Sequence, residues 1–405
     1  MKEIKAKRHF RPWIAFSIVG VLIVAAGIAG ALYLIQKNPS SNDSVEVVKP
    51  APKPISVTAN TLFFGNAFWG RYINDWSMAS PLKTAYPFSR LNEFNRQDYD
   101  AWIAGLECPT VANFSQTSAQ EDSTLSFNCS PDYLPEAAKW FTAFTLANNH
   151  TDNRGAEGFA ETKVHLEQNG IQYFGHYDPD QLKDVCEVIA LPMKVTYDDE
   201  TVKKQSLPVA MCGYHGVFKI PSEESLALME QYSKVMPVIA MPHMGVEYKA
   251  SPDELKTRTY HALIDHGADI VVGDHPHWIQ TTEAYKGRLI VYSMGNFMFD
   301  QQDTAEVVRS AAIRVVMDVK DVDSANLAKW LVLGDDCKAF HDDCLVRIQS
   351  ESLMKLPFEY QFGVVGTNDS GKIVKPATTD QQASILQRLN WSQTMNQLQA
   401  PYSSL

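Results

Sequence analysis

The chain has 405 residues, of which 45% are hydrophobic and 20% charged, and this ordinary globular usage excludes disorder across the whole chain. Asp and Glu outnumber Lys and Arg by 47 to 36, giving a formal net charge of −11, which argues against a nucleic-acid-binding protein. Only one stretch is apolar enough to cross a bilayer, which excludes a membrane protein with several spans.

That stretch is uncharged and runs from Ile14 to Ile35, about 33 Å as a helix at ~1.5 Å per residue. Because positive charge stays on the cytoplasmic side, the sequence predicts a cytoplasmic basic tail at residues 1–13, a transmembrane anchor at residues 14–35 and an extracytoplasmic main domain in the cell membrane. A cleavable signal peptide is the alternative, since Ala29-Gly30-Ala31 fits a cleavage site, but the apolar run continues past it. The flanking charges before the stretch are Lys2, Lys5, Lys7, Arg8 and Arg11, against Glu3.

Residues 36–54 are rich in Pro and Ser, which is typical of an extended linker. After it, short β-rich apolar runs alternate with helical patterns, which predicts a layered α/β domain over residues 55–318. Residues 319–405 form a C-terminal extension with a Gln-rich helical stretch near 381–399, and periodicity leaves open whether it packs on the main domain. The expected strands include residues 56–64, 142–147, 208–212, 237–241, 270–272 and 289–293.

Two helices are marked by signals at their ends. Ser251-Pro252-Asp253-Glu254 fits a capping box with Pro at the first helical position, and Gly267 closes this helix after His266. A second helix is expected over about residues 156–169, ending at Gly170.

Six cysteines lie on the predicted outer side, where an even number suggests disulfides. Pairing between neighbours in sequence is the simplest pattern, and the pair expected first is Cys337 with Cys344. Buried free thiols, and a metal site at Cys337 and Cys344, are the alternatives. The other cysteines are Cys108, Cys129, Cys186 and Cys212.

Four of the eleven histidines follow predicted strands directly: His150, His243, His275 and His277. Ligands bind outside the carboxyl ends of strands in an open α/β sheet, so we expect these four to face one crevice. A single His at a strand end is usually a hydrogen-bonded loop residue, but four such residues favour a shared site for Zn, Mn or Fe. His275 and His277 are two residues apart, which in extended backbone places both rings on one side. The other seven are read as surface or packing residues, with His215 as the one that could prove an exception.

Further polar residues follow the apolar runs in the same way. Asn66 and Arg71 come after the first strand, Glu107 ends a short apolar segment, and Asn296 follows a strand that ends in a Gly turn. An Arg fork beside a metal would suit a phosphate or carboxylate ligand. Each residue alone is more simply a turn residue or half of a surface ion pair.

Over about residues 56–318 the chain resembles the CapA/PgsA capsule-synthesis family, which is linked to poly-γ-glutamate. The resemblance rests on five motifs in the right order, each weak alone. It implies a layered, metallophosphoesterase-like β-sandwich flanked by helices. The motifs are Leu146-Ala-Asn-Asn-His150, Glu167-Gln-Asn-Gly-Ile-Gln-Tyr-Phe-Gly175, Pro242-His-Met-Gly-Val-Glu-Tyr248, Asp265-His-Gly-Ala-Asp-Ile-Val-Val-Gly-Asp-His-Pro-His277 and Leu289-Ile-Val-Tyr-Ser-Met-Gly-Asn-Phe297.

Two positions depart from the family's motifs. Its G-D-x-x-x-x-R motif is here Gly65-Asn66 through Arg71, and its N-L-E motif is Gly105-Leu106-Glu107. The family's Asp would be a metal ligand, and Asn is a weaker, neutral donor, so one metal position is expected to be weakened or empty. By resemblance, a divalent metal (Mn, Zn or Fe) would be held by Glu107, Asn149, His243, His275 and His277. His150 and Arg71 would be the catalytic residues, and Asn66, Glu247 and Asn296 would line the site.

Three functions follow from these observations. The first is a membrane-anchored, extracytoplasmic protein that assists synthesis or export of an anionic polymer such as poly-γ-glutamate, with the membrane, the polymer and its synthase subunits as partners. The second is a metal-dependent hydrolase of a phosphoester or amide bond, which the histidines support and which Asn66 and Gly105 weaken. The third is a non-catalytic binding module with a vestigial site.

Overall fold

The structure is a computed structural model that describes residues 50–339 and 343–405. The expected basic tail, the membrane anchor and most of the linker therefore lie outside the described residues. Within the described ranges, no helix combines the length and the apolar character needed to cross a membrane.

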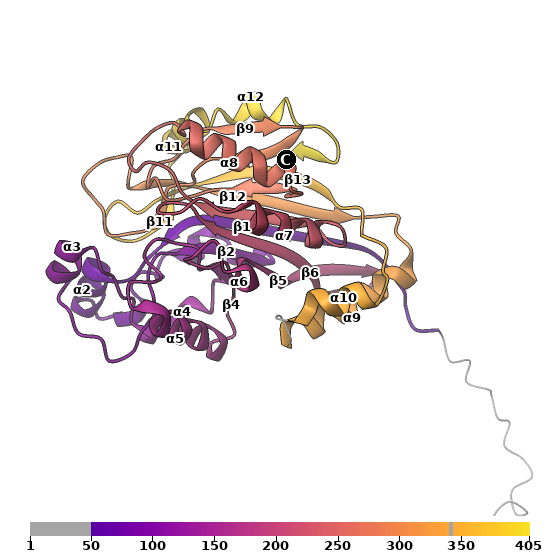
Figure 1. Ribbon diagram of the computed structural model, residues 1–405, viewed down its shortest axis with the longest axis horizontal. Helices are drawn as coiled ribbons and strands as arrows, with labels where there is room; N and C mark the ends of the chain where they lie inside the picture. Colours follow the sequence, from indigo (N-terminus) through magenta and orange to yellow (C-terminus); the bar gives the residue numbers. More distant parts are fainter. Residues whose placement is uncertain (1–49, 340–342) are drawn as a thin grey trace, which may run out of the picture. The chain divides into compact units, whose positions relative to one another are not determined.

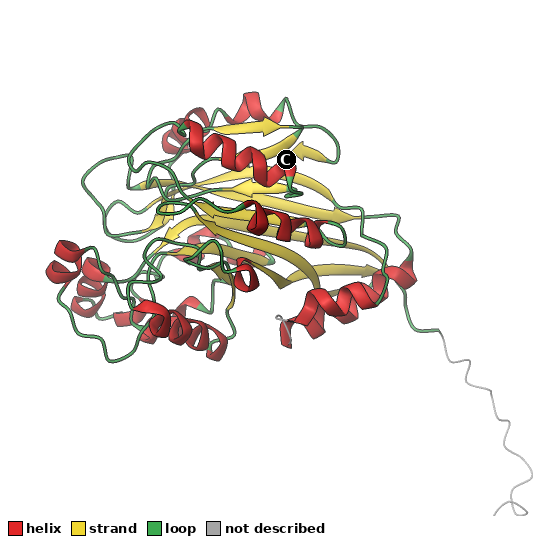
Figure 2. Ribbon diagram, in the orientation of Figure 1, coloured by secondary structure: helices red, strands yellow, loops and turns green. Residues whose placement is uncertain are grey.

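The described strands join into one sheet, with helices packed around it, which confirms the mixed α/β class (Figure 2). The finer expectation of a metallophosphoesterase-like sandwich stays a prediction. Hydrogen bonds order ten of the strands as β14-β13-β12-β1-β5-β6-β7-β8-β10-β9. The strands are β1 (Pro54–Ala67), β2 (Ala101–Leu106), β3 (Ala143–Thr145), β4 (Gln172–Phe174), β5 (Cys186–Tyr197), β6 (Val202–His215), β7 (Val238–His243), β8 (Ile270–Val272), β9 (Thr282–Tyr285), β10 (Arg288–Val291), β11 (Asn296–Met298), β12 (Arg309–Val319), β13 (Glu359–Asn368), β14 (Lys375–Pro376) and β15 (Tyr402–Ser404).

Strand β1 is the branch point of the sheet. Its first residues pair with β5, its middle pairs with β12, and its second half pairs in parallel with β2, which leads on to β3 and β4. Its side chains alternate between two buried clusters: Phe63 enters the core around β5 to β8, and Leu62 and Phe64 enter an aromatic core beside β2. One strand therefore holds both halves of the domain together.

Helices cover the sheet on both sides (Figure 1). Helices α7 and α8 follow β6 and β7, while α9 packs against β5 and β6. The helices are α2 (Arg71–Ala79), α3 (Ser118–Thr124), α4 (Leu134–Ala137), α5 (Gly155–Gln168), α6 (Leu182–Val185), α7 (Glu223–Ser233), α8 (Glu254–Asp265), α9 (Ser324–Ala339), α10 (Cys344–Ser350), α11 (Thr379–Arg388) and α12 (Trp391–Met395), with 3₁₀ turns at Lys83–Ala85, Leu91–Phe94, Arg96–Asp98 and Pro131–Tyr133.

The six expected strands are all present, several of them longer than expected. Helix α5 is also found as expected, but α8 begins two residues later than the capping-box reading. Asp253 caps α8, because its side chain accepts the backbone N–H of Lys256. The Gln-rich stretch forms two helices, separated by Asn390 in a left-handed conformation.

The segment after residue 318 belongs to the same compact unit as the rest of residues 52–405. Strand β13 pairs with β12 along ten residue pairs, so this segment extends the central sheet instead of forming an appendage. The disulfides join sequence neighbours, as expected: Cys108–Cys129, Cys186–Cys212 and Cys337–Cys344.

Candidate functional site

The carboxyl ends of several parallel strands meet at one edge of the sheet, and each carries a polar residue into a common cluster. We call this cluster the polar centre. Apart from the short β11, whose first residue is Asn296, the strands concerned are β1, β2, β3, β7 and β8. The members of the polar centre are Asn66, Glu107, Asn149, His243, Asp274, His275, His277 and Asn296, and all are buried.

A local irregularity brings β1 into the polar centre. The pairing of β1 with β2 shifts by one residue at Gly65, which re-aims Asn66 toward Asn296 of β11. A Cβ atom on Gly65 would lie 1.9 Å from the carbonyl oxygen of Gly295, so only glycine permits this approach.

Imidazole and amide groups bond directly within the polar centre. His243 Nε2 lies 2.7 Å from Asn149 Oδ1 and 3.2 Å from His275 Nδ1, while His243 Nδ1 lies 3.4 Å from the amide nitrogen of Asn148. These partners suit a neutral His243 that carries its proton on Nε2.

A second group forms around His277. Its Nδ1 lies 2.8 Å from Asn296 Oδ1, so the amide oxygen accepts the ring N–H and fixes the ring's orientation. Asn66 donates its amide N–H to the same Asn296 oxygen at 3.3 Å. The other ring nitrogen, Nε2, faces Glu107 Oε1 at 3.7 Å. His277 therefore presents an unprotonated nitrogen toward a buried carboxylate.

The expected extended backbone at His275 and His277 is wrong. Both residues have positive φ, 94° for His275 and 59° for His277, which is unusual for residues other than glycine. Their ring centroids lie 6.2 Å apart. Strained backbone of this kind concentrates at functional sites, where the surrounding structure holds it in place.

Two carboxylates of the polar centre are buried, Glu107 at 1% and Asp274 at 5% exposure, and no hydrogen bond of normal geometry reaches either from the described residues. Burial raises the pKa of Glu107 well above its ordinary value, and the neighbouring Asp274 carboxylate raises it further. Burial also raises the pKa of Asp274, against the opposing effects of the His275 backbone N–H and Lys256. Each acid is therefore poorly stabilised as an anion by its surroundings.

The imidazoles of the polar centre are held neutral. Burial lowers the pKa of His277 to about 4, and it lowers the pKa values of His243 and His275 well below normal. Burial likewise lowers the pKa of His150 to about 4, so this ring is neutral at pH 7. Neutral imidazoles are the form that binds a metal ion.

His150 and Glu247 lie at the border of the polar centre. His150 bonds through its backbone N–H to Asn148 and through Nδ1 to Asn153, and its ring packs on Phe127. Glu247 is partly exposed, and its Oε1 lies 3.9 Å from His275 Nε2.

The expected role of Arg71 as an anion-binding residue stays a prediction. Its guanidinium already makes two bonds to Asp300, at 2.9 and 2.6 Å, and a third to Asp122 at 3.1 Å. It also packs 4.3 Å from the ring centroid of Phe127. Three of its five N–H groups are bonded to these carboxylates, and these bonds anchor the start of α2.

Sequence reasoning missed Asp274 and Asn148, although both stand next to residues that were singled out. It also read His215 as a packing residue. The structure pairs His215 with His243 across β6 and β7, with its buried Nε2 unpartnered among the described residues. The available signal was its position between Gly213 and Gly216, at a strand end like the other four.

The residue types of the polar centre fit a divalent cation, although in the described part of the chain no three His, Cys, Asp or Glu side chains already form a metal-binding arrangement. Within the polar centre, five buried oxygens have no hydrogen-bond partner among the described residues: both of Glu107, both of Asp274 and Oδ1 of Asn66. Unpaired buried carboxylates are costly unless a cation or a proton neutralises them. Oxygen acceptors beside neutral imidazoles suit Mn²⁺, Fe²⁺ or Zn²⁺.

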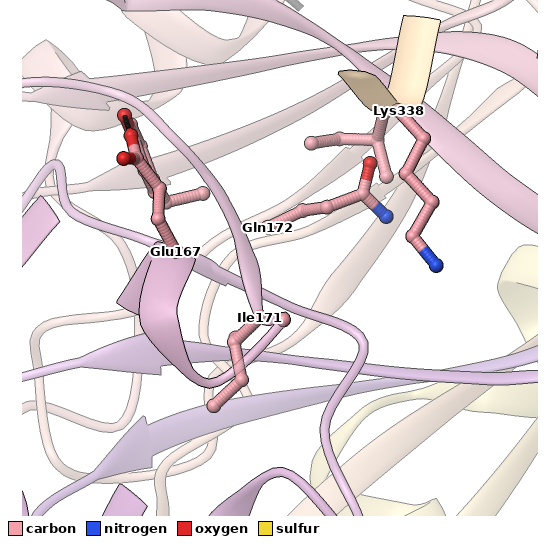
Figure 3. A pocket seen from close by; sticks show the side chains of 7 residues that line it. Glu167, Ile171, Gln172 and Lys338 are labelled. Carbon is pink, nitrogen blue, oxygen red and sulfur yellow. Dashed lines mark hydrogen bonds between the residues drawn. The ribbon is translucent and has the colours of Figure 1, made fainter. Parts of the chain in front are cut away.

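A separate cavity of about 300 Å³ lies between α5, β4 and α9 (Figure 3). Glu167 lies on one side of it, and Gln172 and Lys338 lie on the other. No member of the polar centre lines this cavity, and the Gln172 amide is bonded to the backbone of Ala190.

Comparison with known proteins points to one family. Residues 60–301 match the family described as bacterial capsule synthesis protein PGA_cap. The capsule biosynthesis protein CapA of Bacillus anthracis is 24% identical over 321 residues, which cover 74% of this chain and 71% of that protein. The PGA biosynthesis protein CapA of Bacillus subtilis (strain 168) is 25% identical over 317 residues, with 74% and 75% coverage. Among solved structures, TT1561 of Thermus thermophilus aligns over 63% of this chain and 93% of its own, with 12% identity and a TM-score of 0.34.

Proposed function

The chain belongs to the bacterial capsule synthesis protein family, and we propose that it assists the synthesis or export of an anionic capsule polymer such as poly-γ-glutamate. The observation that carries this proposal is the match across residues 60–301, together with two CapA relatives that each align over 74% of the chain. The uncharged stretch at residues 14–35 supports membrane anchoring, with the main domain outside the cytoplasm and next to the membrane-bound synthase subunits.

We further propose that the polar centre binds a divalent cation as part of this function. Glu107, Asn149, His243, His275 and His277 would hold it, and Asn66 and Asn296 would orient the ligands. When bound, the cation supplies Lewis acidity toward a carboxylate, amide or phosphoester oxygen. Asn296 keeps the His277 ring in its ligating orientation through the 2.8 Å hydrogen bond.

Genetics in the bacterium that carries the gene tests the capsule role. Deletion of the gene is expected to remove polymer from the cell surface, and the wild-type gene is expected to restore it. Complementation with His243→Ala should fail, whereas His261→Ala should succeed, because His261 pairs with Glu283 away from the polar centre. Unchanged surface polymer in the deletion strain would refute the proposal.

The second candidate is a metal-dependent hydrolase, favoured by the neutral imidazoles beside buried carboxylates. The purified full-length chain would be assayed with a general phosphodiester and with poly-γ-glutamate, with and without added Mn²⁺. Cation-dependent turnover that His243→Ala abolishes would support hydrolysis. Cation binding without turnover would leave the accessory role.

A further inference from the structure

We propose that Asp274, which lies outside the set predicted from sequence, is the principal acidic ligand of the cation in the polar centre and supplies the negative charge that Asn66 lacks. This inference rests on the proposed cation centre and deepens it. Asp274 falls at a variable position of the family's motif. Two other positions of the chain, Asn66 and Gly105, depart from the family's motifs.

The Asp274 carboxylate is buried and poorly hydrogen-bonded. The residue is 5% exposed, and neither oxygen has a hydrogen-bond partner of normal geometry among the described residues. The nearest cationic side chain, Lys256, approaches the backbone carbonyl oxygen of Asp274 at 3.5 Å and forms no ion pair with the carboxylate. A buried carboxylate without a partner costs several kcal/mol on the order-of-magnitude scale for such groups unless a cation or a proton neutralises it, and we take a cation as the neutralising group here.

The Asp274 carboxylate points toward the backbone of β1 and β2, near Gly65 and Gly105. A Cβ atom built on Gly105 would lie 3.6 Å from Asp274 Oδ2 and 3.9 Å from Asn66 Oδ1. A Cβ atom on Gly65 would lie 3.1 Å from the same Asp274 oxygen. Asp274 and Asn66 therefore border the same small space, and a longer side chain at position 105 would compete for it. The glycine at 105 leaves that space open to Asp274.

Glu107 is a second buried acid in the polar centre. Glu107 follows β2 directly after Leu106, and both of its oxygens are also buried without a hydrogen-bond partner in the described chain. Two neighbouring carboxylates repel each other, and a cation bound between them would offset that repulsion. Arg71 forms no ion pair with either carboxylate among the described contacts, because its guanidinium bonds to Asp300 and Asp122.

Together these residues describe a ligand set that is richer in oxygen than the predicted one. Asp274, Glu107 and Asn66 contribute oxygen donors, and His277 contributes Nε2. Carboxylate and amide oxygens with a minority of imidazole suit Mn²⁺ in particular. Asp274 would supply the negative charge that an acid at position 66 would otherwise give. The charge would then come from the segment after β8 instead of from β1.

The experiment is a charge swap in the full-length chain. Wild type, Asp274→Asn, Asn66→Asp and the double variant Asn66→Asp with Asp274→Asn would be titrated with Mn²⁺ by calorimetry, and Tm would be measured with and without Mn²⁺. Asp274→Asn is expected to weaken Mn²⁺ binding at least tenfold, and the double variant to regain most of it. Without Mn²⁺, Asp274→Asn should raise Tm, because it removes an unpaired buried charge; an acid with only a structural role would lower Tm.

The matched control is Asp265→Asn, which removes a surface carboxylate paired with Lys286 and should leave Mn²⁺ binding unchanged. If Asp274→Asn does not fold, Asp274→Ser removes the carboxylate with a smaller side chain and serves in its place. Wild-type affinity in both Asp274 variants would overturn this inference and leave the cation centre intact. No Mn²⁺ binding by wild type would overturn the cation centre as well, while the capsule role would still be decided by the polymer at the cell surface.

Discussion

Arg71 and Asp300 form a buried bidentate ion pair that joins the start of α2 to the segment after β11. The side chains are 6% and 2% exposed, and the two bonds are 2.9 and 2.6 Å long. The pair stands next to the polar centre, and Arg71 also bonds to Asp122, which is largely exposed.

Removal of either residue should therefore leave the other as a buried charge without this partner. We expect Arg71→Met to lower the free energy of unfolding by about 3 kcal/mol or more, because breaking a buried ion pair leaves an uncompensated charge. Asp300→Leu should cost a similar amount, and the double variant should cost less than the sum of the two. Urea denaturation of the four proteins measures this coupling. The control is Arg258→Met, whose exposed pair with Glu254 should contribute about 0.5 kcal/mol or less; strictly additive losses at 71 and 300 would contradict the interpretation.

The Cys108–Cys129 disulfide should stabilise the polar centre as well as the fold, because Cys108 directly follows Glu107. Replacing both cysteines with Ser should lower the free energy of unfolding by about 3 kcal/mol, as expected for a loop of this length. It should also weaken Mn²⁺ binding. The matched change at Cys337 and Cys344, which lie in α9 and α10, should lower stability but leave Mn²⁺ binding unchanged. Equal effects of the two changes on Mn²⁺ binding would argue against a local role.

The turn after β4 should make the protein less stable in mild acid. Burial lowers the pKa of His176 below its ordinary value of 6.5, and its Nδ1 accepts the backbone N–H of Asp178 at 2.9 Å. The unfolded chain therefore binds a proton more readily than the folded one, so this contribution is complete above pH 6.5 and is lost as the pH falls toward the lowered value. His176→Asn keeps an acceptor without titrating. Between pH 7 and 5, the free energy of unfolding of this variant should fall less steeply with pH than that of wild type. The reason is that the variant lacks the uptake of up to one proton per molecule on unfolding. Parallel curves would exclude His176 as a contributor.

Gly65 should tolerate no side chain at all. In Gly65→Ala the new Cβ would stand 1.9 Å from the Gly295 carbonyl oxygen, so β1 and the turn before β11 would have to separate. We expect a loss of stability of several kcal/mol, on the scale of overpacking and strain, together with weaker Mn²⁺ binding. Gly170→Ala is the matched control, because it has positive φ but open space around it, and should cost about 1 kcal/mol. Thermal denaturation distinguishes the two, and equal losses would show that φ alone matters at Gly65.

Local signals were sufficient for much of the fold. Apolar runs marked the six expected strands, and Gly170 and Gly267 marked helix ends, because turn chemistry is written in a few neighbouring residues. The start of α8 was misplaced, because Ser251 and Asp253 are both good N-caps and only the backbone decides between them. The role of β13 was not predictable, since its pairing with β12 is a contact between distant segments.

Local sequence signals likewise predict only part of the polar centre. Strand-end histidines next to glycine were found because the carboxyl ends of parallel strands share an edge. The pairing of Arg71 with Asp300 was not predictable, because the two residues are 229 positions apart in the sequence. Asp274 was missed because a residue directly before His275 looks like part of a turn, and only the packing of its carboxylate near Gly65 and Gly105 shows where the side chain lies.

The position of β1 at the branch of the sheet affects how the protein is made. Thr61 pairs with Val315, about 250 residues later. One edge of β1 therefore has no partner until a segment near the end of the chain has been made. Until then β1 can pair with β2 and β5 along one edge, while its other edge stays open to aggregation and to a holding chaperone. A product truncated before β12 would keep that edge exposed permanently and should be removed by proteases instead of accumulating as a partial domain.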